Sequence, residues 1–439
     1  MTIDPSAVPA PEAETATPTP DEGAFMSLLR RARLLGPALA VVAFAGACAS
    51  NAPQDTLEPE GRYARDIDRL SDPIFIVAGV VFVLVLGGAV LIALRFRARG
   101  QEHFEDMPSQ IHGHNALEIG WTLLPAVVLG LVGVASVAAI FNLAEEPPED
   151  AVTVQVVGNQ WWWEYRYDVN GNGSYSDPED VVTANDLVIP AGQQVGLEIT
   201  SRDVIHSFWA PKLNGKRDAV PNRTHPWNLQ ADEPGEFIGQ CTEYCGLSHA
   251  EMRLKVVALD EADFDAWIAE QQRDAEPYAE GDESLEALGY QVFTQQLCSS
   301  CHQIDGINEE NFSDEDVPEF ARDIMGGPGT ITDPLLQASR HAPNLTHLMS
   351  RTTFAGGKFD LVRDTEECRA LGLDWAEDPE TRDRCLDRGA LEAWLRNPPA
   401  EKAMQAEAVP GRSPRRGMPA LDLTEEQIDQ LVSYLMTLT

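Results

Sequence analysis

The sequence is poor in positive charge. It holds 32 lysines and arginines against 70 aspartates and glutamates, which gives a formal net charge of −38 at pH 7. So acidic a chain is not a nucleic-acid binder; it favours either a basic partner or simply a solvated acidic surface. With 439 residues it is also too long for one ordinary domain, so we expect two or three folded units.

Cysteine is scarce as well. Only seven cysteines occur, and four of them fall into two short motifs that also contain histidine. The other three are Cys48, Cys368 and Cys385. Cys368 and Cys385 lie close in sequence and could form a disulfide, which is expected only outside the cytoplasm.

The first motif is the segment 239–252, which reads GQCTEYCGLSHAEM. Its side chains with soft or borderline donor atoms are Cys241, Cys245, His249 and Met252. Thiolate, imidazole and thioether are ligands of copper electron-transfer sites, whereas hard cations require oxygen. Tetrahedral zinc would need a fourth strong ligand, and Met is a poor one. A second histidine is needed, and His206 in SRDVIHSFWA is the candidate; a disulfide between the two cysteines is the alternative.

With His206 upstream, the pattern C-x-E-x-C-x-x-x-H-x-x-M resembles the binuclear CuA site of subunit II of the haem-copper cytochrome c oxidases. The resemblance implies that the two cysteines bridge two copper ions and that each histidine binds one of them. It also implies that Met252 is a weak axial ligand and that the backbone carbonyl of Glu243 is the other. In that family the side chain of this glutamate also reaches a magnesium ion at the interface with subunit I.

The first 47 residues are expected to be a disordered tail followed by a secretory signal. Residues 1–25 are rich in Pro, Thr, Ala and acids and lack an apolar period, and Met26 begins a more conventional opening. A basic segment, a short apolar run and small residues then precede Cys48. These small residues resemble a lipoprotein cleavage box, so we predict lipidation of Cys48, with an uncleaved anchor helix or plain secretion as alternatives.

Residues 48–145 contain two apolar runs, at about 74–94 and 119–143, that are long enough to cross a hydrocarbon core. The first run is followed by the basic RFRAR and the second by the acidic EEPPED. The positive-inside rule places the arginine-bearing loop in the cytoplasm and everything after residue 144 on the outer side. We therefore predict a transmembrane hairpin in a bacterial cell membrane.

Glu118, in LEIGWTLLP, stands at the cytoplasmic mouth of the second run. An ionisable group near a membrane core suggests a function, with a solvated acid at a helix end as the alternative. The sequence LExxWTxxP resembles the second helix of the same subunit II family. In that family this glutamate stands at the entrance of a proton pathway into subunit I.

Residues 151–260 alternate β-rich runs with turns, which predicts a β-sandwich or barrel. With the copper motif in a late loop, this region resembles a cupredoxin domain. Trp161, Trp162 and Trp163 are consecutive, and because strand side chains alternate we expect at least one near the surface. GNQWWWEY resembles the family's aromatic stretch, which implies that electrons enter through Trp161; a core tryptophan is the alternative.

One turn of this region, DVNGNGSYSDPE, fits a calcium-loop template between Asp168 and Glu179. Such a loop offers enough oxygen ligands for calcium. Because the flanking segments look like strands, an EF-hand is excluded. We favour a plain hairpin loop, with a calcium site as the alternative.

The acidic segment 261–284 is expected to begin with a short amphipathic helix and to end as a linker. The next stretch contains C-x-x-C-H, the covalent attachment motif of c-type haem. Cys298 and Cys301 would form the thioethers, and His302 would be the proximal iron ligand. A thioredoxin-like redox pair is the alternative, but it lacks a βαβ context and leaves the histidine without a role.

A second iron ligand is needed, and Met with His is the usual pairing in cytochromes c. The candidates are Met325, Met349, Met404 and Met418. RRGMPAL, just before a predicted helix at 424–438, resembles the methionine loop of class I cytochromes c and favours Met418. APNLTHL resembles the segment whose proline carbonyl accepts a hydrogen bond from the proximal histidine, which implies this role for Pro343.

In class I cytochromes c the closing helix packs on the helix before the haem motif. The resemblance implies a crossing of helices at 285–297 and 424–438, with Gly289 and Phe293 meeting Leu431 and Tyr434. Residues 285–439 are longer than a small cytochrome c requires because of two acidic insertions, around 305–333 and 356–388. A disulfide in the second insertion would close a loop that otherwise has little core.

These observations predict a multidomain membrane protein: a signal, a two-helix transmembrane hairpin, an all-β cupredoxin domain and an all-α cytochrome c domain. The resemblance implies a cytochrome c oxidase subunit II that passes electrons from a fused haem through CuA to subunit I, where the family reduces dioxygen and pumps protons. It implies subunits I and III as partners, with a quinol-cytochrome c reductase or a cytochrome c upstream. The alternatives are the CuA-containing subunit of a nitric oxide reductase and a copper-delivery assembly protein.

Overall fold

The computed structural model describes residues 52–97, 112–175, 177–279, 281–296, 298–308, 342–376, 378–404 and 417–439. From Pro53 onward the described residues form one compact unit. The predicted tail and signal in residues 1–47, the start at Met26 and the lipidation site Cys48 lie outside the described residues. So do Met325 and most of the first acidic insertion.

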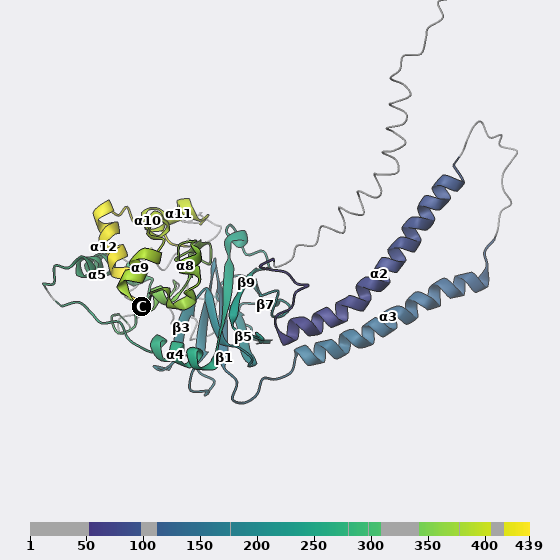
Figure 1. Cartoon of the computed structure of the whole chain (residues 1–439), viewed down its shortest axis with the longest axis horizontal. Helices are drawn as coiled ribbons and strands as arrows, with labels where there is room; N and C mark the ends of the chain where they lie inside the picture. Colours follow the sequence, from purple (N-terminus) through teal and green to yellow (C-terminus); the bar gives the residue numbers. More distant parts are fainter. Residues whose placement is uncertain are drawn as a thin grey trace, which may run out of the picture. The chain divides into compact units, whose positions relative to one another are not determined.

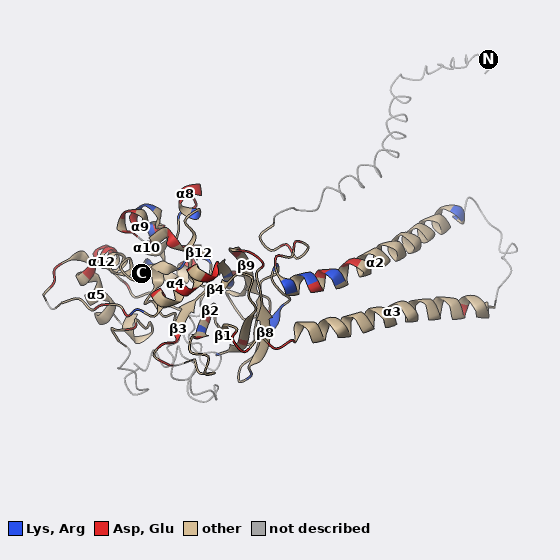
Figure 2. Ribbon diagram, turned by 60° about the horizontal axis from the view of Figure 1, so that its bottom comes forward, with Lys and Arg blue, Asp and Glu red and all other residues tan. Residues whose placement is uncertain are grey.

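Two long apolar helices come first, α2 (Arg62–Arg95) and α3 (Asn115–Leu143). Both are long and apolar enough to cross a membrane, and their apolar side chains are exposed along most of their length. Figure 2 shows charged residues at the two ends of α2 and almost none along α3. α2 begins well before the predicted span because its first turns bind the sheet domain: Arg65 pairs with Asp232 there.

The middle of the chain forms two five-stranded sheets, ordered β3-β2-β1-β5-β8 and β4-β10-β9-β6-β7 (Figure 1). The strands are β1 (Thr153–Asn159), β2 (Trp162–Asp168), β3 (Val181–Ala184), β4 (Asp186–Pro190), β5 (Val195–Ser201), β6 (His206–Trp209), β7 (Arg217–Ala219), β8 (His225–Leu229), β9 (Gly235–Cys241) and β10 (Arg253–Leu259). β1 pairs with β5 in parallel, as does β4 with β10, and the other pairs are antiparallel. Apolar side chains of both sheets share one core, so the predicted cupredoxin-like sandwich is confirmed.

The prediction of a surface aromatic in the tryptophan run is wrong, because all three side chains are buried. Trp163 packs edge-on against Phe208 inside the sandwich, with ring centroids 5.6 Å apart. Trp161 and Trp162 line a cavity to which the C-terminal region also contributes. The side chains of the strand do alternate, but a later part of the same chain covers the face that would otherwise be exposed.

The acidic segment 261–284 begins with helix α4 (Glu261–Gln271), as expected. The apolar side chains of this helix, Phe264 and Trp267, are buried and join the core of the sandwich. Trp267 packs edge-on against Tyr167 of β2, with ring centroids 5.3 Å apart. The first half of the segment is therefore part of the sheet domain.

The C-terminal region is helical and has its own apolar core. Its helices are α5 (Leu285–Gln295), α8 (Glu366–Arg369), α9 (Pro379–Cys385), α10 (Arg388–Arg396), α11 (Pro398–Glu401) and α12 (Glu425–Leu435), with the short strands β11 (Thr353–Phe354) and β12 (Phe359–Asp360). α12 crosses α5 where Gly289 lies: a Cβ there would come 2.0 Å from the Gln430 carbonyl oxygen. Phe293 packs on Tyr434 at the same crossing, so the predicted helix pair is present.

The second acidic insertion is better packed than we expected. Cys368 and Cys385 form a disulfide, as their spacing suggested. Both sulfurs are buried, and Trp375 between them in sequence is fully buried in the core of the C-terminal region. Our prediction that this loop has little core is therefore wrong; the disulfide closes a segment that also contributes a tryptophan to the core.

Candidate metal centre and adjoining cavity

The second sheet brings the predicted metal ligands together. His206 is the first residue of β6 and Cys241 is the last residue of β9, and these two strands are paired neighbours. After β9 the chain turns through Cys245 into the short 3-10 helix η1 (His249–Glu251). Met252 follows η1 and leads directly into β10. Ligands that are up to 46 positions apart in sequence thus meet at one end of the sheet.

All predicted ligand atoms converge on two sulfur atoms, Cys241 Sγ and Cys245 Sγ, which lie 3.8 Å apart. Cys245 Sγ lies 3.6 Å from His249 Nδ1 and 3.8 Å from Met252 Sδ, whereas Cys241 Sγ lies 3.9 Å from His206 Nδ1 and 3.3 Å from the Glu243 carbonyl oxygen. Both thiols are free, which argues against the disulfide alternative.

Within the described ranges, one group of His, Cys, Asp or Glu ligand atoms gathers closely enough to hold a metal ion. It consists of His206, Cys241 and Cys245, whose ligand atoms all lie within 4.8 Å of one another. All three side chains are buried. Two thiolates with an imidazole, beside a second imidazole and a thioether, suit copper and are unsuited to calcium or magnesium.

The local electrostatics favour a thiolate at this centre. Hydrogen bonding between the two thiols, with His206 beside them, lowers the pKa of Cys241 to about 3. The same bond and burial raise the pKa of Cys245. Because the thiolate is the form that binds metals, Cys241 is prepared for binding at neutral pH.

Asp203 orients the ring of His206, and sequence reasoning missed it. Its Oδ1 lies 2.8 Å from His206 Nε2, which directs Nδ1 toward Cys241. Burial alone would lower the pKa of His206, but Asp203 outweighs it and raises this pKa to about 9. Carboxylates commonly orient metal-binding histidines in this way. The only signal in the sequence is the position of Asp203 three residues before the histidine.

Trp161 lies against the same centre. Its indole Nε1 donates a hydrogen bond to the Cys245 carbonyl oxygen at 3.1 Å, and Gln160 Nε2 donates to the same oxygen at 2.6 Å. Trp161 also lines the cavity that the C-terminal region helps to form. This side chain is therefore common to the metal centre and the cavity.

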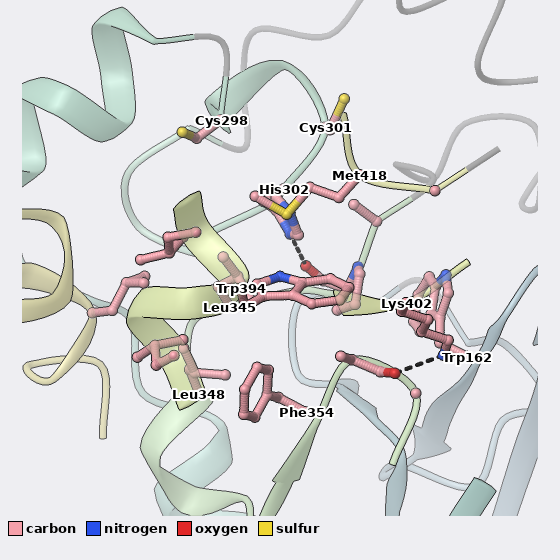
Figure 3. Close-up of a pocket in the computed structure, with 18 of the residues that line it drawn as sticks. Trp162, Cys298, Cys301, His302, Leu345, Leu348, Phe354, Trp394, Lys402 and Met418 are labelled. Carbon is pink, nitrogen blue, oxygen red and sulfur yellow. Dashed lines mark hydrogen bonds between the residues drawn. The ribbon is translucent and has the colours of Figure 1, made fainter. Parts of the chain in front are cut away.

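The cavity brings together the C-x-x-C-H motif and the sandwich (Figure 3). Its wall contains Cys298, Cys301 and His302, with Trp161 and Trp162 on the sandwich side. Much of the remaining wall is apolar and includes Phe293, Leu345, Leu348, Phe354, Leu391, Trp394, Leu395, Leu431 and Leu435. Neither cysteine of the motif is in a disulfide, and burial raises the pKa of Cys298 to about 12.

His302 is held by the contact that the resemblance implied. Its Nδ1 lies 2.9 Å from the Pro343 carbonyl oxygen. A hydrogen bond at one ring nitrogen fixes the tautomer and orientation of a metal-binding histidine. Figure 3 shows His302 and Met418 extending into the same cavity.

The methionine candidates separate into two groups. Met404 and Met418 both line the cavity. Met404 packs beside Gly417, the residue that precedes Met418. Met349 is fully buried in the core of the C-terminal region and is absent from the cavity wall. The position of the cavity therefore leaves Met404 and Met418 as the described candidates.

Two buried cations in the cavity wall were not foreseen. Arg351 donates to the Asn344 carbonyl oxygen at 2.5 Å, and its buried Nε has no partner among the described residues. Lys402 is almost fully buried and donates to backbone carbonyls. No sequence signal marks either residue, because their burial arises where distant segments meet.

The remaining predicted sites stand apart from this centre. Glu118 lies in the first turn of α3, where its Oε1 accepts the backbone N–H of His114 at 3.1 Å. In the loop from Asp168 to Glu179, the Asp168 carboxylate accepts backbone N–H groups of the loop itself. Across the described part of the chain, no group of three metal-ligating acids gathers in this loop. The choice between a plain hairpin loop and a calcium site stays a prediction.

Comparison with known protein families finds two matches. Residues 152–259 match the family described as cytochrome c oxidase subunit II, periplasmic domain. Residues 58–139 match the family described as cytochrome c oxidase subunit II, transmembrane domain. The first match spans the sandwich with its metal centre, and the second spans the two apolar helices.

Individual relatives extend the similarity. Cytochrome c oxidase subunit 2 of Alkalihalophilus pseudofirmus is 29% identical over 418 residues, which cover 94% of this chain and 99% of the relative. The protein of the same name in Bacillus subtilis is 30% identical over 343 residues, 74% of this chain and 83% of the relative. A solved periplasmic domain of subunit II of the Bradyrhizobium japonicum cytochrome oxidase is 27% identical and covers 29% of this chain and 97% of its own, with a TM-score of 0.26.

Proposed function

The chain belongs to the cytochrome c oxidase subunit II family, and we propose that it carries electrons from a c-type haem in its own C-terminal region to a dicopper centre in its sandwich domain. As a subunit II it is part of an oxidase complex and partners subunit I. One observation carries the proposal. Trp161 donates to the carbonyl of Cys245 and also lines the cavity that contains the C-x-x-C-H motif.

The copper ligands in this proposal are those toward which the two sulfurs converge. Cys241 and Cys245, with His206 and His249 beside them, would hold the two ions. Met252 and the carbonyl of Glu243 are the weaker ligands. The donor set fits copper because soft thiolates and a thioether stand beside imidazoles in a buried site.

The haem in this proposal is attached through Cys298 and Cys301, with His302 and Met418 as axial ligands and Pro343 as the hydrogen-bond partner of His302. An apolar wall with both free thiols on it fits the porphyrin, and the unpartnered Nε of Arg351 fits a propionate carboxylate. We assign the region the class I cytochrome c fold on the helix crossing and this arrangement.

When bound, each group would accept and release one electron at a time. The chain's own residues hold the ligands still while the charge changes. The metal ligands sit on paired strands of a rigid sandwich, and Asp203 locks the His206 ring. Because these ligands are buried and held rigidly, little rearrangement accompanies each change of charge. Trp161 gives a direct hydrogen-bonded route between the cavity and the backbone of Cys245.

We also propose how the chain lies in the membrane and which partners it contacts. The two apolar helices anchor the protein in a bacterial membrane, with the sandwich and the C-terminal region on the outer side. Subunit III and an upstream quinol-cytochrome c reductase or cytochrome c complete the assembly, and Glu118 stands at a proton-path entrance into subunit I. The side chain of Glu243 reaches a magnesium ion at the subunit I interface, and the signal segment ends in a lipidated Cys48.

Purification of the assembled complex from membranes tests this function. We expect two copper ions and one covalently bound haem c per chain, measured by metal analysis and by the pyridine haemochrome spectrum of the denatured chain. We also expect oxygen consumption with reduced cytochrome c that is coupled to proton release. Reduction of nitric oxide without oxygen consumption would assign the chain to the alternative reductase, and a chain without haem would end the proposal.

A further inference from the structure

The tryptophan that touches the metal centre is covered by the chain itself. Trp161 and Trp162 are 5% and 7% exposed. The residues that meet them at the cavity wall come from the C-terminal region and include Ala355, Gly356, Lys402 and Met404. The sandwich and the C-terminal region therefore meet at Trp161, and the contacts there decide how the cavity stands relative to Cys245.

Lys402 is the central contact. Its ammonium group donates to the carbonyl oxygens of Ala355 at 2.6 Å, Trp161 at 2.8 Å and Glu251 at 3.3 Å. Two of these carbonyls belong to the sandwich domain and one to the C-terminal region. The three N–H bonds of one ammonium group thus join both parts of the chain at the backbone of Trp161 and next to Met252.

The backbone of the C-terminal region approaches this point unusually closely. A Cβ at Gly356 would lie 2.1 Å from the Trp161 carbonyl oxygen and 2.4 Å from Lys402 Nζ. Gly356 has a positive φ of 74°, a conformation that glycine adopts without strain. Its carbonyl oxygen accepts the backbone N–H of Arg253 at 2.9 Å, so the loop bonds to the start of β10 as well.

A second contact lies nearby on the same loop. The buried carboxylate of Asp186 in β4 accepts the backbone N–H and the hydroxyl of Thr352, both at 2.7 Å, and the hydroxyl of Thr353 at 2.5 Å. A buried carboxylate satisfied by three donors from the other region is a specific contact. Asp186 and Lys402 are thus two buried charged contacts in the docked arrangement, beside the backbone bond between Arg253 and Gly356.

We propose that Lys402 is a positioning residue that holds the haem-bearing region on the backbone of Trp161, so that the two electron-carrying parts of the chain are docked at a fixed separation. The proposal rests on the proposed function for the identity of the two redox groups. A flexibly tethered region would need no buried ammonium group, and burying one without compensation is costly. The three carbonyl oxygens supply that compensation, and two of them are available to Lys402 only while the regions are docked.

The test uses the full complex with Lys402→Met, which keeps the length of the side chain and removes its donors. Lys212→Met is the control, because Lys212 is a lysine of the sandwich domain that pairs with Glu60, away from the C-terminal region. Electrons are injected into the haem by a light-activated ruthenium complex, and their arrival at copper is followed by absorbance. Since electron transfer between separated centres slows as their distance grows, we expect a several-fold slower transfer in Lys402→Met and an unchanged rate in the control.

Two further measurements separate positioning from a general structural role. Lys402 interacts electrostatically with Cys245, so removal of the cation lowers the copper reduction potential in Lys402→Met. Gly356→Ala pushes the same surfaces apart without a change in charge, so it slows transfer and leaves the potential nearly unchanged. Amide hydrogen exchange in the peptide that contains Trp161 is slow in the wild type and faster in both variants.

Wild-type transfer rates and exchange in Lys402→Met would overturn the proposal. If neither variant assembles, fast exchange of the Trp161 peptide in the wild-type complex would overturn it equally. A wild-type chain with copper and without haem would refute the proposed function, whereas slow exchange at Trp161 in that chain would still support the docking.

Discussion

A network of buried charged residues lies next to the segment that leads into the metal centre. Glu164 in β2 forms ion pairs with Arg166 at 2.6 Å and Arg202 at 3.2 Å, and all three side chains are buried. Burial alone would raise the pKa of Glu164, but the two guanidinium groups outweigh it and hold that pKa below its ordinary value. Arg202 directly precedes Asp203, the residue that orients His206. The network therefore fixes the segment that carries His206, one of the proposed copper ligands.

We predict that Glu164→Gln destabilises the protein by about 3–5 kcal/mol at neutral pH, because it leaves two buried guanidinium groups without a counter-charge. A carboxyl group with a lowered folded pKa contributes stability that is present above its unfolded pKa of 4.5 and is lost as pH falls through the folded value. The wild type should therefore lose this stability in acid, below about pH 4.5, and the variant should show a flatter pH profile. Thermal unfolding of the full chain in detergent measures both effects.

The matched control for this prediction is Glu236→Gln. Glu236 also pairs with a cation, Lys255, at 2.9 Å, but its side chain is 43% exposed. Exposed pairs contribute about 0–1 kcal/mol, so this variant should melt close to the wild type. Equal losses of stability in the two variants would show that burial of the Glu164 network does not increase its contribution to stability.

The axial methionine gives a second prediction at the residue scale. Met418→Ala should lose the iron–sulfur charge-transfer absorption of the oxidised haem, because the thioether ligand to the iron is gone. Met349→Ala is the control and should keep the band, since Met349 lies in the core away from the cavity wall. A band that survives in Met418→Ala and disappears in Met404→Ala would move the assignment to Met404.

At the scale of elements, the C-terminal region depends on how closely α5 and α12 approach each other. The crossing has no room for a side chain at Gly289, because a Cβ would also lie 2.7 Å from Tyr434 Cβ. α12 begins with a capping box in which Thr424 and Gln427 satisfy each other's backbone N–H groups. The two helices are thus placed by a defined start and a defined point of contact. They form one wall of the cavity through Phe293, Leu431 and Leu435.

We predict that Gly289→Ala destabilises the C-terminal region by about 1–3 kcal/mol, the usual cost of overpacking. Gly389→Ala in α10 is the control, because the nearest atom to a Cβ at this position would be 3.7 Å away. The better helix propensity of alanine should therefore stabilise the C-terminal region by up to about 1 kcal/mol. Denaturant unfolding followed by haem absorbance measures both changes. Stabilisation by alanine at both positions would contradict the tight crossing.

At the scale of the whole molecule, the long apolar stretches of the two helices carry no charged residue. The acidic residues of the two helices, Asp66, Asp68, Asp72 and Glu118, lie outside their long apolar stretches, whereas α2 ends in Arg95 and continues into Arg97 (Figure 2). The disulfide between Cys368 and Cys385 is of a kind that forms in oxidising compartments. Both features favour a hairpin with its connecting loop in the cytoplasm and the folded regions outside.

Fusion proteins test this orientation. Alkaline phosphatase, which is active only outside the cytoplasm, should be active when fused after Thr439 and inactive when fused after Arg97. A green fluorescent protein that fluoresces only in the cytoplasm is the control and should show the opposite pattern. Phosphatase activity at both positions would contradict the hairpin.

The sequence by itself determined the local chemistry of this protein. The soft donor atoms between Cys241 and Met252, the C-x-x-C-H motif, the apolar runs and the spacing of Cys368 and Cys385 are all properties of short segments. The types of possible ligands and the lengths of apolar runs can be read directly from such segments. The candidate metal ligands, the membrane helices and the disulfide could therefore be predicted. The crossing at Gly289 could be inferred only through resemblance to a known family.

Only the tertiary structure decided which surfaces the two folded regions share. Strand alternation predicted an exposed tryptophan, and the C-terminal region buries it instead. Lys402 and Asp186 carry no local signal, because a charged side chain looks the same in sequence whether it is solvated or buried between distant segments. Their partners are backbone carbonyls and hydroxyls more than 40 positions away. The segment 239–252 therefore supplies the soft ligands of the proposed copper site, and the fold alone sets that cluster behind Trp161 and next to the cavity.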